Sequence, residues 1–82
     1  MLVKVLFFAR LKEQLGEVAT QVELADGENS QDLKQQLIAR GDKWQALADS
    51  SILMAVNQQH ISQPVALHNG DEIAFFPPVT GG

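Results

Sequence analysis

Residues 69–82 read NGDEIAFFPPVTGG and contain a turn, a strand and a tail in succession. The opening Asn-Gly pair is a strong signal for a tight turn. The alternation that follows predicts a strand over Asp71–Phe76, with Ile73 and Phe75 facing a core and the residues between them facing outward. This stretch therefore predicts the last strand of a sheet, and it also contains the residues that point to function.

The prolines that follow this strand predict a change of structure. They have no backbone N–H to donate, so the chain cannot continue inside a sheet, and they favour an extended conformation. The glycines after them lack Cβ atoms and form a thin peptide that fits a narrow tunnel. We therefore expect a folded domain over residues 1–76 and a flexible C-terminal tail over residues 77–82. The tail residues are Pro77, Pro78, Val79, Thr80, Gly81 and Gly82.

The carboxylate of Gly82 is the predicted reactive group. An ionised carboxylate is a poor acyl electrophile, but activation by ATP to an acyl-adenylate gives it a good leaving group. Attack by a sulfur donor would then give a thiocarboxylate, whereas attack by an amine would give an amide. The tail itself is compatible with both products.

The rest of the chain predicts an α+β domain. Leu2–Phe8 alternates as a strand with Val3, Val5 and Phe7 inward, and a short helix follows until Gly16 ends it. The main helix is expected to begin with Ser30 as its N-cap and to end near Arg40. The remaining expected elements are a strand over Thr20–Leu24, a helical turn over Asp42–Leu47, a strand over Ile52–Asn57, a bend at Gln58-Gln59 and a short strand near His60-Ile61. Strands on both sides of one main helix indicate one sheet with that helix packed on one face.

Composition narrows the class of protein. With 82 residues the chain allows one domain, and with no cysteine it has no thiolate nucleophile and no disulfide. The net charge of −4 argues against nucleic-acid binding, which needs clustered Lys and Arg. Neither a signal peptide nor an apolar run long enough for a membrane is seen, so we expect a cytoplasmic protein that does not associate with membranes.

Three segments resemble one known family. They are VLFFARLKE at residues 5–13, LMAVNQ at residues 53–58 and the NGDEIAFFPPVTGG stretch at residues 69–82. The chain is similar to the small, sulfur-carrier subunits of molybdopterin synthase, and the similarity covers its whole length. That resemblance implies the ubiquitin-like β-grasp fold, with one mixed sheet and a main helix on one face.

The resemblance also implies a reaction cycle. An E1-like adenylating enzyme uses ATP on Gly82, a sulfurtransferase or desulfurase system converts it to a thiocarboxylate, and the carrier itself binds no cofactor. The tail, with Gly81 easing entry, then inserts into the large subunit and donates sulfur to cyclic pyranopterin monophosphate to form the dithiolene of molybdopterin. The implied assembly has two small and two large subunits, with the catalytic residues on the large one.

Phe8 and Phe76 are the predicted contacts with a partner. Both fall on the outward side of their strands, so they would form an exposed aromatic patch if those strands are neighbours. His60 is expected at the edge of that patch, where the family has an apolar residue. His60 and His68 lack a third ligand, so no metal site is expected.

Three other functions are compatible with parts of this sequence. A thiazole-pathway sulfur carrier shares the fold and the terminal glycines but is shorter and lacks the Phe-Pro-Pro sequence. A ubiquitin-like protein modifier would use the same tail to form an isopeptide bond with a lysine. A plain interaction domain would have an inert tail.

Overall fold

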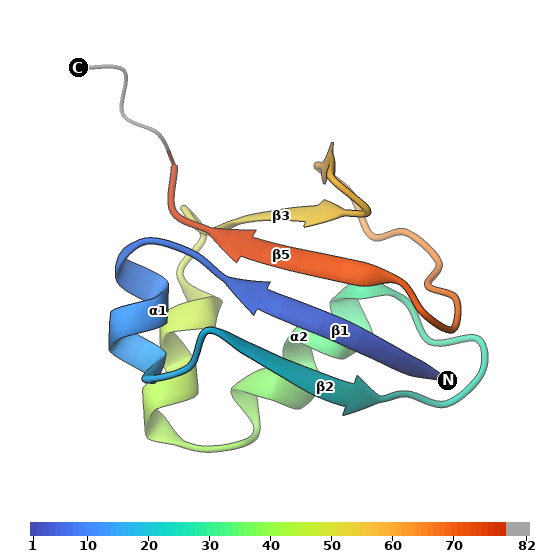
Figure 1. Cartoon of the computed structure of the whole chain (residues 1–82), viewed down its shortest axis with the longest axis horizontal. Helices are drawn as coiled ribbons and strands as arrows, with labels where there is room; N and C mark the ends of the chain where they lie inside the picture. Colours follow the sequence, from blue (N-terminus) through green and yellow to red (C-terminus); the bar gives the residue numbers. More distant parts are fainter. Residues whose placement is uncertain (79–82) are drawn as a thin grey trace.

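Residues 1–78 are described in a computed structural model of the chain, and they form one sheet with helices against one of its faces (Figure 1). The five strands lie in the order β2-β1-β5-β3-β4, and only the β1–β5 pair is parallel. The elements are β1 (Leu2–Phe7), α1 (Arg10–Leu15), β2 (Ala19–Glu23), α2 (Ser30–Ile38), the 3₁₀ helix η1 (Asp42–Ala48), β3 (Leu53–Val56), β4 (Gln59–Ile61) and β5 (Glu72–Phe76). This arrangement confirms the predicted β-grasp fold.

The core lies between the sheet and the helices. Val3, Val5 and Phe7 of β1 are buried, as the alternating pattern predicted, and they meet Ile73 and Phe75 of β5. The rings of Phe7 and Phe75 stack with their centroids 6.1 Å apart. The helices complete this core with Leu11, Leu15, Leu33, Leu37, Trp44 and Leu47, all of them buried.

Glycine ends α1 as expected, since Gly16 adopts the left-handed conformation at φ 69° and donates its backbone N–H to the carbonyl of Lys12. The connection into α1 is unusual. Ala9 has φ 55° and ψ −136°, a backbone conformation that L-residues rarely adopt. Ala9 thus lies between Phe8, which follows β1 directly, and Arg10, the first residue of the helix.

The prediction that Ser30 caps α2 is wrong. Asn29 is the N-cap: its side chain accepts hydrogen bonds from the backbone N–H groups of Gln31 and Asp32, and the Asp32 carboxylate accepts one from the N–H of Asn29. This reciprocal arrangement is a capping box. Ser30 is instead the first helical residue, and its buried hydroxyl accepts a hydrogen bond from the N–H of Val65. The helix also ends at Ile38, two residues before the predicted end.

The bend between β3 and β4 lies one residue earlier than predicted. Asn57 and Gln58 occupy it with φ of 50° and 71°, and Gln59 already belongs to β4. Two consecutive residues at positive φ are typical of the tight turn that joins antiparallel strands, and asparagine tolerates that conformation well. The shift matters because it sets the face of the sheet on which His60 lies.

Among residues 1–78, no helix has the length and apolar character that crossing a membrane requires.

Candidate partner-binding face and tail

The parallel pairing of β1 with β5 brings the two predicted aromatic residues to the same end of the sheet. Phe7 pairs with Phe75, and the N–H of Phe8 donates to the carbonyl of Phe75 over 3.2 Å. Phe8 is 47% exposed and Phe76 is half-buried. Both residues lie on the face of the sheet that is free of helices. Their strands are neighbours, which is the condition under which the sequence predicted an exposed aromatic patch.

His60 joins the same face from the other side. Ala55 of β3 pairs with both His60 of β4 and Ala74 of β5, which places the three residues in one row across the sheet. The ring of His60 tilts toward that of Phe76, with centroids 6.2 Å apart. The structure therefore brings together all three residues that the sequence assigned to a partner contact.

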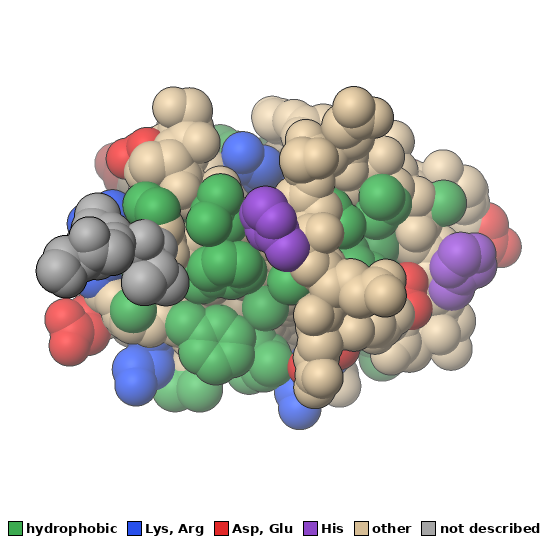
Figure 2. Space-filling view, turned by 90° about the horizontal axis from the view of Figure 1, so that it is seen from above, with side chains coloured by type: hydrophobic (Ala, Val, Ile, Leu, Met, Phe, Trp, Pro, Cys, Tyr) green, Lys and Arg blue, Asp and Glu red, His purple; other side chains and the backbone are tan. Residues whose placement is uncertain are grey.

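Further apolar residues extend this surface. Leu53 pairs with Phe76 and Leu6 pairs with Ala74, so both fall on the same face. We call the outer-face patch the set Leu6, Phe8, Leu53, His60, Ala74 and Phe76. Figure 2 looks onto this side of the molecule and shows hydrophobic side chains gathered together. Sequence reasoning missed Leu53 as a member because its face follows from its pairing with Phe76, which only the fold reveals.

The tail begins beside this patch. Strand β5 ends at Phe76, and Pro77 and Pro78 have no regular structure, with Pro77 half-buried and Pro78 exposed. The predicted reactive group on Gly82, and the predicted insertion residues Val79, Thr80 and Gly81, lie outside the described residues. The described part of the tail shows that the chain leaves the sheet at the end where Phe8 and Phe76 lie.

No metal centre is built by the residues that the structure describes. Within residues 1–78 there is no group of three or more His, Cys, Asp or Glu side chains that could hold an ion. The side chain of His68 is 80% exposed, with Nδ1 3.8 Å from a carboxylate oxygen of Asp71. Asp71 has a structural role: it accepts hydrogen bonds from the side chain of Asn57 and the backbone of His68.

The hydrogen bonds to Asp71 change its acidity. The bond from Asn57 is the largest cause that lowers the pKa of this carboxyl, partial burial opposes it, and the His68 backbone and charge lower it further. The pKa of Asp49 is lowered as well, through the backbone and hydroxyl of Ser51. Neither carboxylate belongs to the outer-face patch, so neither is assigned to the chemistry of the tail.

A mixed sheet with helices on one face, an apolar opposite face and a proline-led tail at its end defines a ubiquitin-like β-grasp domain. A model of the ThiS family matches residues 5–82. The molybdopterin synthase sulfur carrier subunit of Escherichia coli (strain K12) is 49% identical over 82 residues, which cover 99% of this chain and all of the relative. That of Haemophilus influenzae is 45% identical with the same coverage. The chain therefore belongs to the ThiS family, together with these sulfur carrier subunits.

Solved structures agree with this assignment. SAMP1 from Haloferax volcanii superposes with a TM-score of 0.86 at 25% identity, over the full length of both chains. A chain in the protein–protein complex of subunits 1 and 2 of molybdopterin-converting factor from Helicobacter pylori 26695 superposes with a TM-score of 0.75 at 26% identity, again over both full lengths.

Proposed function

We propose that this protein is the sulfur carrier subunit of molybdopterin synthase, in molybdenum cofactor biosynthesis. The observation that carries the proposal is the similarity to the Escherichia coli carrier subunit, at 49% identity over the whole of that protein. The family match extends to residue 82, so it includes the tail as well as the domain. The β-grasp fold and the outer-face patch are consistent with this role.

The proposed chemistry takes place on Gly82. Its carboxylate oxygen attacks the α-phosphorus of ATP in an E1-like enzyme, forming an acyl-adenylate and releasing pyrophosphate. The terminal sulfur of a persulfide, supplied by a sulfurtransferase or desulfurase system, then attacks the acyl carbon and displaces AMP. A thiol of that system cleaves the resulting acyl disulfide, which leaves a thiocarboxylate on Gly82 and a disulfide on the donor. This carrier encodes no cysteine, so the transferred sulfur must come from another molecule. Two such transfers, one from each of two loaded carriers, to cyclic pyranopterin monophosphate build the dithiolene, and oxygen from water restores each carboxylate.

The tail and the outer-face patch have separate parts in this proposal. In this proposal residues 77–82 are the segment that enters the large subunit, and the domain over residues 1–76 holds it there through Phe8, Phe76 and His60. The complex of subunits 1 and 2 from Helicobacter pylori supports the large subunit as the partner. We assign the catalytic residues to the large subunit, two copies of each subunit to the assembly, and the cytoplasm as the location.

Protein modification is a second candidate function. Two solved structures to which this chain is similar favour it. One is SAMP1 from Haloferax volcanii, and the other, from Methanosarcina acetivorans, is named small archaeal modifier protein 1 and is 29% identical. Both functions begin with the same activated carboxyl group. They differ in the product, which is a thiocarboxylate for the carrier and an isopeptide conjugate for the modifier.

Reconstitution of the synthase tests the proposal. Wild-type protein and a variant without Gly81 and Gly82 are each combined with the large subunit, the activating enzyme, ATP, a sulfur donor and cyclic pyranopterin monophosphate. We expect molybdopterin from the wild type and none above background from the truncated variant, with matching circular dichroism spectra. Equal product from the truncated variant would overturn the proposal.

A further inference from the structure

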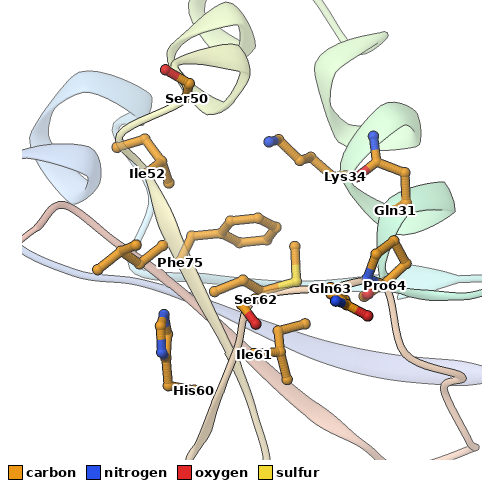
Figure 3. A pocket seen from close by; sticks show the side chains of 13 residues that line it. Gln31, Lys34, Ser50, Ile52, His60, Ile61, Ser62, Gln63, Pro64 and Phe75 are labelled. Carbon is orange, nitrogen blue, oxygen red and sulfur yellow. The ribbon is translucent and has the colours of Figure 1, made fainter.

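A groove of about 320 Å³ lies between α2 and the β3–β4 edge of the sheet. Figure 3 shows Gln31 and Lys34 reaching into it from α2, with Phe75 and Ile52 facing them. Ser62 and neighbouring residues of the loop after β4 close another side. We call this feature the β3–β4 groove.

The groove combines an apolar floor with one ammonium group. The half-buried side chains of Ile52 and Met54 supply the accessible floor above the buried Phe75, and the flexible thioether of Met54 adapts to different side chains. Among residues 1–78, Lys34 is the only Lys or Arg that lines the groove, and no Asp or Glu lines it. In the same part of the chain Lys34 forms no ion pair, whereas Lys43 pairs with Glu17. The groove therefore offers an uncompensated positive charge on a protein whose net charge is −4.

This groove is continuous with the outer-face patch. Leu53 and His60 belong to that patch, and both also line the groove. The β3–β4 edge thus connects the two surfaces, and a partner that covers Phe76 and His60 needs only to extend around this edge to reach Lys34. Energetic anchors at protein interfaces are commonly large side chains that fill such pockets.

We infer that the β3–β4 groove is a second docking site for the large subunit, which inserts one large apolar side chain next to an Asp or Glu. The apolar side chain packs on Ile52 and Met54, and the carboxylate pairs with Lys34. This inference rests on the proposed function, because the large subunit is its partner. It adds a specific anchor, in which an acidic group selects the orientation of the partner on the carrier.

Titration calorimetry with the purified large subunit tests the groove with two variants. Lys34→Glu reverses the charge on the rim, and Ser62→Trp fills the groove from an exposed position of the loop. We expect each variant to raise Kd roughly tenfold, the effect of losing one anchor contact. The effect of Lys34→Glu should shrink at high salt, where charge interactions are screened.

Lys12→Glu is the matched control, since it makes the same charge change on the exposed face of α1, outside the groove. If Kd is unchanged for Lys34→Glu and Ser62→Trp while Phe76→Ala still weakens binding, the groove is not a docking site for the large subunit. The proposed function would not be affected by that result. The groove would also be excluded as a docking site for the large subunit if these variants weakened binding to the activating enzyme alone. Failure of the wild-type protein to bind the large subunit would instead count against the proposed function.

Discussion

At the scale of single residues, the outer-face patch depends on Phe8 and Phe76, which come from the two ends of the sequence. Phe8 is held at the end of β1 by its N–H bond to Phe75, next to the reversal at Ala9. Strained backbone of this kind costs roughly 1–3 kcal/mol and persists where surrounding structure enforces it. The surrounding structure here is the start of α1, where Leu11 is buried, whereas Phe8, three residues earlier, is exposed.

Phe76→Ala is expected to weaken binding to the large subunit by roughly 10- to 100-fold, because a central aromatic contact is worth on the order of 1–3 kcal/mol. Calorimetry against the purified large subunit measures it. Val18→Ala is the matched control: Val18 is 63% exposed and apolar, but it is not part of the patch. Affinity that is the same for Phe76→Ala and wild type would remove Phe76 from the interface.

Residue patterns predicted much of this site but not all of it. The faces of Phe8 and Phe76 followed from strand alternation alone, since each strand has a clearly apolar opposite side. Leu53 could not be assigned, because the apolar run of β3 has no alternation to separate its faces. The Ser30 prediction failed since Asn29, an equally good N-cap residue, lies immediately before it and has Asp32 three positions on.

At the scale of elements, one hydrogen-bonded cluster joins the β3–β4 turn to the start of β5. The N–H of Asn57 donates to the carbonyl of Glu72, the N–H of Glu72 donates back to the Asn57 side chain, and Asn57 Nδ2 donates to Asp71 over 2.9 Å. These bonds hold Asn57 in its positive-φ conformation. The turn and the strand therefore stabilise each other.

The cluster predicts a pH dependence of folding stability. The pKa of Asp71 is lowered in the folded state, so its contribution is fully present above the unfolded pKa, about 3.9, and is lost as pH falls through the folded pKa. Asp71→Asn should be less stable than wild type at neutral pH, with the difference narrowing below about pH 4. Urea unfolding of the wild type and of Asp71→Asn across this pH range measures the difference in stability and its narrowing.

Asn57→Ala provides a second arm, because the Asn57 side chain is the main cause of the lowered pKa. In that background the effect of Asp71→Asn should be smaller at neutral pH. A difference between Asp71→Asn and wild type that stays constant from neutral pH to well below the pKa of an ordinary aspartate would contradict this assignment.

At the scale of the whole molecule, the order of elements was enough to predict one sheet with a helix on one face, and the family resemblance implied that the sheet is mixed. Periodicity identified β1, α2 and β5 with their buried faces, since each has an apolar pattern several residues long. The β3–β4 groove was not predictable. Its lining comes from α2, the segment between η1 and β3, β3, β4, β5 and the loop after β4, and no local sequence pattern marks that loop.

The proposed function requires that Gly82 carries sulfur, and this is tested most directly by the intact mass of the protein purified from a bacterium that makes molybdenum cofactor. A variant without Gly82 is purified in parallel, and material that lacks the modification is treated with ATP, the activating enzyme and a sulfur donor. We predict a mass gain that matches one sulfur in place of one oxygen, in the wild-type protein and not in the truncated variant. A wild-type mass that stays unmodified both after purification and after this treatment would contradict the proposal that Gly82 carries sulfur.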